Sequence, residues 1–265
     1  MRRTKTILIQ LLLVPALVLL SRPLFAETAF LFGKIGDLPV AASLERYDGS
    51  LSGWYFYNSN ARQIRLEGKV DGNGAFQMEE SVDGKKTGIF NGTVKDKSWI
   101  GTWQKPAGGN PLSLSLTENR NPLKDWSGEF SGTARERDAK SGYTYKWEFK
   151  LRIVNGAVKK FSSTQGFAGD DKDEQFCSID SKDLKQVPSE AGILLQAKGD
   201  ESNDDEPECA IRIMKEGDLI WIRFEDGAEE GNNCRGIGST MFCAPRAFWN
   251  ALIYDGRTQK LKGVK

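Results

Sequence analysis

The side chains best suited to binding a ligand lie in one short, strongly aromatic stretch of the first half of the chain. In Trp54-Tyr55-Phe56-Tyr57, alternate side chains of a strand point to opposite faces, so Trp54 and Phe56 share one face and Tyr55 and Tyr57 the other. Tryptophan and tyrosine join an apolar ring to one polar atom, which suits both core packing and stacking on a sugar or another flat ligand. The candidate ligand-binding residues are therefore the aromatic residues Trp54, Tyr55, Tyr57, Trp99 and Trp103.

The chemistry open to this chain is limited because it contains no histidine. That absence excludes Ser-His-Asp and Cys-His catalysis, histidine general bases and nearly all catalytic zinc sites. Carboxylates remain, and the candidate glycosidase acids are Glu45, Glu67, Glu79 and Glu80. A glycosidase needs two carboxyl groups at a defined separation, whereas neighbours on a strand point to opposite faces. We therefore expect solvent-facing glutamates, no catalytic residues and no enzyme activity.

The elements that position the aromatic residues are short strands separated by glycine turns. Corners at Asp71-Gly72-Asn73-Gly74, Asp83-Gly84 and 107–110 divide the region at regular intervals. This spacing is typical of an antiparallel meander that closes into a small barrel or sandwich. Glycines inside the strands fit barrel corners, where strands bend or pack closely. Strands are predicted at 40–47, 54–57, 64–68, 75–80, 87–94, 98–103 and 112–116, after an entry segment at 27–39.

The second half of the chain also has the pattern of strands. Residues 143–153 alternate apolar and polar side chains, and the following Asn155-Gly156 predicts a tight hairpin. A polar segment at 117–125 has the composition of a linker. The sequence therefore predicts an all-β protein with two antiparallel domains, a β-meander barrel at 27–119 and a disulfide-stapled β domain at 126–265. One larger sandwich is the alternative. Further strands are expected at 157–161, 176–179, 192–198, 209–214, 219–224 and 248–254, with a short helix near 181–185.

Residues 1–26 have the pattern of a signal peptide. Basic residues precede an apolar run at 7–20, and Ala26 offers a small residue for cleavage. A membrane anchor is the alternative, but the run is shorter than the ~20 residues that span a bilayer. Removing residues 1–26 takes away four basic residues and no acid, so the net charge of +1 becomes −3. We expect a periplasmic or secreted protein, with no nucleic-acid partner and no stable membrane anchor after cleavage.

All four cysteines lie in the last third of the chain, and export would place them where disulfides form. Four cysteines allow three pairings, and proximity along the chain favours Cys177–Cys209 and Cys234–Cys243. The spacing lacks the CxxC or histidine partners of a zinc site. Two acidic clusters, at 170–174 and 200–206, do not match a calcium-loop pattern and are typical of solvated loops. No metal and no cofactor are expected.

Two resemblances add to this interpretation. Residues 51–116 resemble a domain of exported bacterial proteins with a G-W/Y-Y-F-Y strand, an L-x-G strand, a G-K-x-T-G-x-F-x-G hairpin and a G-T-W strand, which implies a barrel and an exported location. The segment from Cys177 to Tyr254, with Cys243-Ala244-Pro245-Arg246-Ala247, resembles the cysteine-rich part of LprI-type lysozyme inhibitors. Here Ala244 and Pro245 replace the usual glycine and its follower. This second resemblance implies a protein-binding or inhibitory role, with Arg235 and Arg246 as candidate partner-binding residues.

Three functions are compatible with these observations. The first is a non-catalytic envelope protein that binds a ligand or a protein, with inhibition of lysozyme or another hydrolase as one such role. The second is a carbohydrate-binding module or a carboxylate-based glycosidase, suggested by the five aromatic residues. The third is a structural envelope protein without a small-molecule site. We expect a packed barrel interior in a scaffold or protein-binding role, and an open one in a small-ligand role.

Overall fold

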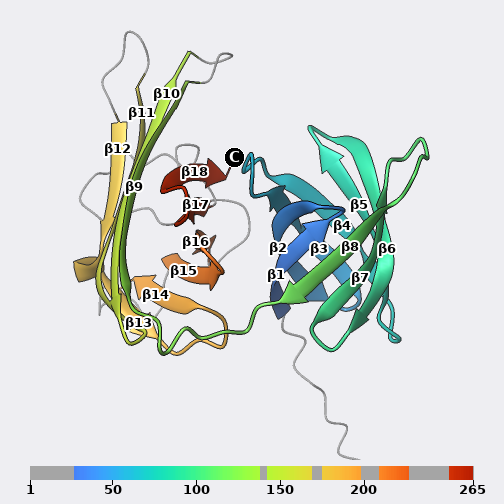
Figure 1. Ribbon diagram of the computed structural model, residues 1–265, viewed down its shortest axis with the longest axis horizontal. Coiled ribbons are helices and arrows are strands. Elements are labelled where there is room, and N and C mark those ends of the chain that lie inside the picture. Colours follow the sequence, from blue (N-terminus) through green and yellow to red (C-terminus); the bar gives the residue numbers. More distant parts are fainter. Residues whose placement is uncertain (1–26, 138–141, 169–174, 198–208, 227–250, 265) are drawn as a thin grey trace, which may run out of the picture.

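The computed structural model describes residues 27–137, 142–168, 175–197, 209–226 and 251–264. Within them the chain forms eighteen strands and one short 3-10 helix, η1 (Ser181–Asp183), so the all-β prediction is confirmed. Three layers lie side by side in Figure 1: a four-stranded sheet, a six-stranded sheet and a closed barrel. The six-stranded sheet is the middle layer.

The barrel is an antiparallel meander of eight strands in which each strand pairs with the next. It closes where β1 pairs with β8, with Leu31 opposite Glu118 and Ile35 opposite Leu114. The prediction of an entry segment at 27–39 is therefore wrong, because those residues supply the closing strand and the start of β2. The strands are β1 (Glu27–Ile35), β2 (Leu38–Tyr47), β3 (Ser50–Tyr57), β4 (Ile64–Val70), β5 (Ala75–Val82), β6 (Lys85–Lys95), β7 (Ser98–Gln104) and β8 (Leu112–Glu118).

Alternate residues of every barrel strand point inward and fill the interior with apolar side chains. Glycines on adjacent strands leave space for the large side chains of the barrel interior. Gly92 and Gly101 lie opposite each other on β6 and β7, and a side chain on Gly92 would overlap the ring of Phe76. The buried interior cluster includes Leu31, Leu44, Tyr55, Leu66, Met78, Phe90, Trp99 and Leu114.

The second half of the chain forms two sheets packed face to face. The four-stranded sheet, in the order β12-β11-β10-β9, contains β9 (Gly128–Arg137), β10 (Thr144–Val154), β11 (Ala157–Ala168) and β12 (Gln175–Asp180). The six-stranded sheet runs in chain order through β13 (Leu184–Val187), β14 (Ile193–Ala197), β15 (Cys209–Glu216), β16 (Leu219–Asp226), β17 (Ala251–Asp255) and β18 (Lys260–Val264). Between the sheets lies a core that includes Phe149, Leu151, Phe161, Ile211, Ile213, Ile222 and Leu252.

The six-stranded sheet is apolar on both faces, and its second face packs against the outer wall of the barrel. Trp221 on β16 is fully buried there. Its ring lies edge-on, at centroid distances of 5.5–6.0 Å, to four aromatic rings of β1 and β3. These rings belong to Phe30, Phe32, Trp54 and Phe56. The barrel and the sandwich are thus joined by a buried apolar contact.

Polar contacts border this apolar contact. Arg223 on β16 donates through Nη1 to Ser43 Oγ on the barrel wall, and its guanidinium lies over the rings of Phe30 and Trp54. Lys262 on β18 donates through Nζ to the carbonyl of Ser59 in the β3–β4 loop. These bonds satisfy basic side chains that would otherwise lose hydration beside apolar surface.

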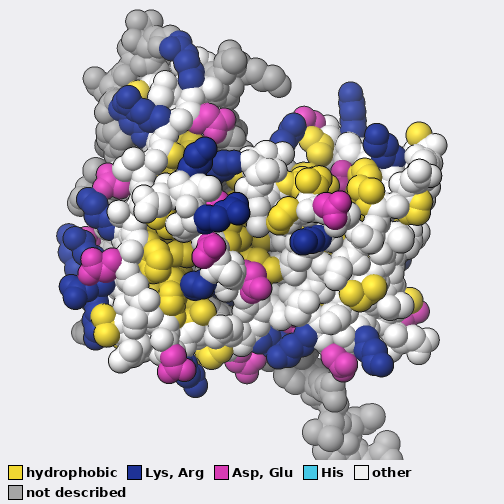
Figure 2. All heavy atoms as spheres, in the orientation of Figure 1, with side chains coloured by type: hydrophobic (Ala, Val, Ile, Leu, Met, Phe, Trp, Pro, Cys, Tyr) yellow, Lys and Arg dark blue, Asp and Glu magenta, His cyan; other side chains and the backbone are white. Residues whose placement is uncertain are grey.

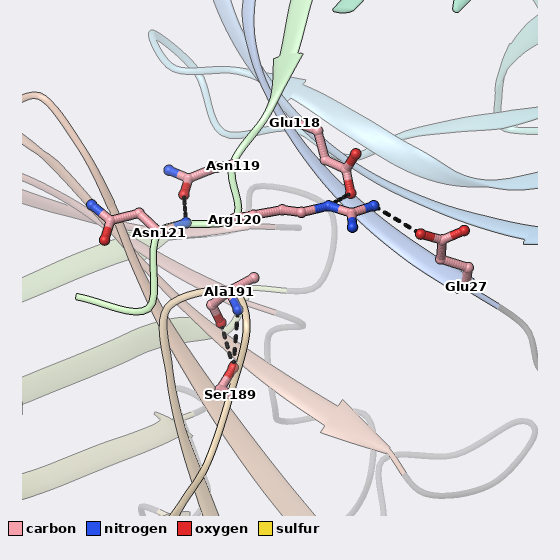
Figure 3. A network of polar contacts seen from close by, with 7 residues as sticks. All are labelled: Glu27, Glu118, Asn119, Arg120, Asn121, Ser189 and Ala191. Carbon is pink, nitrogen blue, oxygen red and sulfur yellow. Dashed lines mark hydrogen bonds and ion pairs between the residues drawn. The ribbon is translucent and has the colours of Figure 1, made fainter. Parts of the chain in front are cut away.

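The segment between β8 and β9 is held at the junction by a network of polar contacts (Figure 3). Arg120 pairs with Glu118 at 2.8 Å and with Glu27 at 2.9 Å. One residue earlier, Asn119 Nδ2 donates to the carbonyl of Lys215 on β15 at 3.2 Å. The connection is therefore attached to both halves of the molecule.

Replacing Trp221 tests the contact between the barrel and the sandwich. Trp221→Ala would leave a cavity among four aromatic rings, so we expect the free energy of unfolding to fall by about 3–5 kcal/mol. Urea unfolding, followed by tryptophan fluorescence and circular dichroism, measures this change. The control Ile100→Ala removes a side chain that is 52% exposed on the barrel wall and should cost far less. A similar loss in both variants would contradict the interpretation.

Candidate functional site

The five aromatic residues singled out from the sequence do not form one surface. Tyr55, Tyr57, Trp99 and Trp103 point into the barrel, whereas Trp54 points outward against Trp221. The predicted division of residues 54–57 between two faces is correct. Trp99 is buried against Phe76 near the end of the barrel opposite Tyr57 and Trp103, so a single stacking platform of all five residues is not formed.

A buried carboxylate lies near the end of the barrel where β3 and β5 finish and β6 begins. Glu80 is only 5% exposed. Its Oε2 accepts hydrogen bonds from Tyr55 Oη at 2.7 Å and Trp103 Nε1 at 2.6 Å, and its Oε1 accepts one from Thr87 Oγ1 at 2.6 Å. All three donors are neutral, and their short distances are typical of bonds to a charged acceptor. The expectation of a solvent-facing Glu80 is therefore wrong.

A local irregularity of the sheet builds this cluster. Opposite β5, Glu80 pairs with Gly88 and Ser81 pairs with Lys86, so Thr87 is the extra residue of a β-bulge. The bulge directs the Thr87 hydroxyl at Glu80, and Gly88 leaves space for Trp103. The sequence contained a signal for this cluster. Phe76, Met78 and Glu80 are alternate residues of β5, so their side chains lie on the same face of the strand.

The environment of Glu80 favours a structural role over a catalytic one. Each of its oxygens is already held by protein donors, and the neighbouring Glu79 points to the other face, where it pairs with Lys86 at 2.5 Å. Burial, followed by the charge of Glu80, raises the pKa of Tyr55 far above its usual range. Burial also raises the pKa of Tyr57. Tyr55 therefore stays protonated at ordinary pH and donates its hydrogen bond to Glu80.

A large hollow lies between the barrel and the sandwich. We call it the interdomain cleft, and its volume is about 1090 Å³. One wall is the outer face of β3–β5 with the β3–β4 loop, and the other consists of β9, β10 and β18. Its lining residues are Ser52, Gly53, Trp54, Asn60, Ala61, Arg62, Gln63, Arg65, Ser81, Val82, Asp83, Ala134, Arg135, Glu136, Trp147, Leu261, Lys262 and Gly263.

Charged side chains lie on both walls of this cleft, and two arginines belong to the barrel wall. Arg62 contacts Asp83 at 3.1 Å, and Arg65 contacts Glu67 at 2.6 Å, in each case through Nη2. Side chains this exposed, 58% for Arg62 and 72% for Arg65, remain hydrated, and such ion pairs contribute little to stability. The guanidinium groups therefore remain available to a ligand.

Several predicted features fall outside the described residues. Cys234, Cys243, Arg235 and Arg246 lie there, as do residues 1–26 and the acidic clusters at 170–174 and 200–206. Cys177 belongs to β12 and Cys209 begins β15, and the proposed disulfides stay predictions. Among the described residues, no group of three or more potential ligands could hold a metal ion.

Comparisons with known proteins found no protein similar to this chain. No family model, no curated protein and no solved structure shows a significant match to this chain. In the part of the chain that the structure describes, no helix has the length and apolar character needed to cross a membrane.

Substituting Gly88 tests the carboxylate cluster. A methyl group at this position would overlap Trp103 Nε1 and lie 2.8 Å from Glu80 Oε2, so Gly88→Ala should disrupt the Trp103–Glu80 bond. Leaving a buried charge short of one donor costs roughly 1–3 kcal/mol of unfolding free energy, which urea denaturation measures. The control is Gly72→Ala, because nothing lies within 4 Å of the added carbon there. Equal stability of the two variants would refute this account.

The raised pKa of Tyr55 predicts a loss of stability at alkaline pH. Below pH ~10 tyrosine is protonated in both the folded and the unfolded chain, so its contribution is constant. Above that pH the unfolded tyrosine ionises while the folded one keeps its proton, and unfolding becomes more favourable by up to ~1.4 kcal/mol per pH unit. Urea midpoints between pH 9 and 11 should fall less steeply for Tyr55→Phe than for the unaltered protein. If the urea midpoints of the two proteins fell in parallel with pH, the raised pKa of Tyr55 would be contradicted.

Proposed function

We propose that this protein is an exported, non-catalytic binding protein of the cell envelope, and that its ligand or protein partner occupies the interdomain cleft. The observation that carries the proposal is the cleft itself. A hollow of about 1090 Å³ between two β units is large enough for a ligand, and binding sites occur preferentially at domain interfaces.

The rigidity of both walls supports a preformed site. The barrel wall is fixed by the contact of Trp221 with Trp54 and Phe56. The opposite wall contains Trp147, which is part of the sandwich core. A site that does not need to be ordered on binding loses less conformational entropy.

A binding role is favoured over catalysis by the chemistry of the described carboxylates. Glu80 is enclosed by three donors, and the chain has no histidine. The cleft carboxylate of Asp83 is exposed and paired with Arg62, and ion pairs of this kind are common on solvated surfaces.

The inhibitor role remains part of this proposal. The resemblance to LprI-type inhibitors, with Arg235 and Arg246 as partner contacts, predicts binding of a lysozyme. The aromatic and polar lining of the cleft supports the carbohydrate alternative, because the half-buried ring of Trp54 contributes to it. We propose no nucleic-acid partner and no stable membrane anchor for the mature chain.

Calorimetric titration of the exported chain, residues 27–265, tests the proposal. The panel comprises chitotetraose, maltotetraose, tetragalacturonate, soluble peptidoglycan fragments and several lysozymes. We expect at least one member to bind in the micromolar range, and Ser81→Trp, which places a large ring in the cleft, to abolish that binding. The control Thr102→Trp adds the same ring on β7, outside the cleft, and should bind normally. Failure of every member, or equal binding by both variants, would overturn the proposal.

A further inference from the structure

We infer that the interdomain cleft binds an oligosaccharide that carries carboxylate groups, an inference that rests on the proposed binding function. The argument starts from the barrel wall of the cleft. Register places Arg65 on β4 opposite Trp54 on β3 and Ser81 on β5. Side chains directly opposite one another on adjacent strands have Cβ atoms about 5 Å apart. A ring, a guanidinium and a hydroxyl therefore form one row across three strands.

The ring in this row is held in place from one side. Trp54 lies 5.5 Å from the Trp221 ring and 5.7 Å from the Arg223 guanidinium, measured to ring centroids. The indole is half-buried, and the part not covered by these neighbours lines the cleft. A fixed indole with one open side presents the apolar surface on which the C–H face of a sugar ring packs.

The charges of the cleft favour an acidic ligand over a neutral one. Four of the six charged lining residues are basic: Arg62, Arg65, Arg135 and Lys262. The ion pairs of Arg62 and Arg65 each use a single terminal nitrogen. A guanidinium has five N–H donors in a planar fork that matches a carboxylate with two parallel hydrogen bonds. Both arginines thus keep donors for a carboxylate of the ligand.

The remaining polar groups suit hydroxyl groups. Asn60 and Gln63 bring amides from the β3–β4 loop, and Ser52 and Ser81 bring hydroxyls from the strands. Amides and hydroxyls both donate and accept, as sugar hydroxyls require. On the face shown in Figure 2, basic and acidic side chains lie beside apolar ones over the junction of the two domains.

An extended peptide fits the cleft less well. A peptide that binds by strand addition needs a free sheet edge, and the two edges beside the cleft are β9 and β18. On β18, Leu261 and Gly263 are buried, so the backbone there is not open to a new strand. On β9, three consecutive charged residues end the strand, a feature that opposes strand addition: Arg135, Glu136 and Arg137.

Calorimetry with three matched probes tests the inference on residues 27–265: tetragalacturonate, maltotetraose and tetraglutamate. We expect tetragalacturonate to bind at least tenfold more tightly than either other probe. The double variant Arg62→Gln/Arg65→Gln should weaken its binding by about tenfold or more, since a hydrogen bond to a charged group contributes roughly 1.5–3 kcal/mol. The control is Arg152→Gln on the outer face of β10, because Arg152 has the same 58% exposure as Arg62 and is also ion-paired. Binding by the control should change less than twofold.

Stacking is tested separately by Trp54→Phe, which keeps an aromatic ring against Trp221 but offers less surface. We expect severalfold weaker binding of tetragalacturonate, with a smaller fall in the urea midpoint than Trp221→Ala causes, because a ring remains against Trp221. Equal binding of tetraglutamate, or equal loss in the Arg152→Gln control, would overturn the inference. If tetragalacturonate does not bind while another ligand is excluded by Ser81→Trp, the binding function stands and the saccharide assignment fails. If nothing binds, both fail.

Discussion

The structure depends on one sheet that is buried on both faces. The six-stranded sheet packs one face on the four-stranded sheet and the other on the barrel, so successive residues of β16 cannot alternate between apolar and polar. Ile220, Trp221 and Ile222 are all buried. The apolar surface removed from water by Trp221 and its four aromatic neighbours is the main attraction between the barrel and the sandwich. The cleft exists because these two bodies are held together at this contact and diverge beside it.

The interior of the barrel, in contrast to this apolar contact, contains a buried charged group, the carboxylate of Glu80. An unpaired carboxylate in an apolar core would be unstable, but a carboxylate with three donors is tolerated. Tyr55, Thr87 and Trp103 come from three different strands, so their bonds to Glu80 hold β3, β6 and β7 to β5. This cluster sets the geometry at the end of the barrel where the β3–β4 loop begins, and that loop forms part of the cleft.

Much of the fold could be predicted from local patterns, and the failures have identifiable causes. Alternation along 143–153 and the glycine turns of the first half identified the strands correctly, because turn residues and the alternation of β10 are local signals. The closing strand β1 was missed because its Phe30-Leu31-Phe32 run does not alternate: Leu31 faces the barrel interior while Phe30 and Phe32 face Trp221. Burial on both faces depends on a partner that lies about 190 residues away in the chain.

The candidate site was less predictable than the fold. The burial of Glu80 could have been predicted, because it alternates with Phe76 and Met78 and so shares their face of β5. Its hydrogen-bond donors could not, because one of them lies in a bulge whose position depends on how β5 and β6 pair. The cleft has no local signal, since its lining comes from three separate parts of the chain, at 52–83, 134–147 and 261–263. Only the relative placement of the barrel and the sandwich brings these parts together. The sequence placed Trp54 and Phe56 on one face of their strand without deciding which face is outward, and that direction follows only from the contact with Trp221.

The burial of Phe30, Phe32 and Phe56 under Trp221 has a consequence for biogenesis. During the export that we propose, the polypeptide crosses a membrane from its amino terminus and delivers the barrel strands well before β16. Even after β8 arrives and the barrel closes, the aromatic side chains on its outer wall stay exposed to solvent. They are covered only when the last third of the chain has emerged and β16 can dock. Such transient patches promote aggregation, so the interval between barrel closure and docking of the sandwich is when this protein most needs a chaperone.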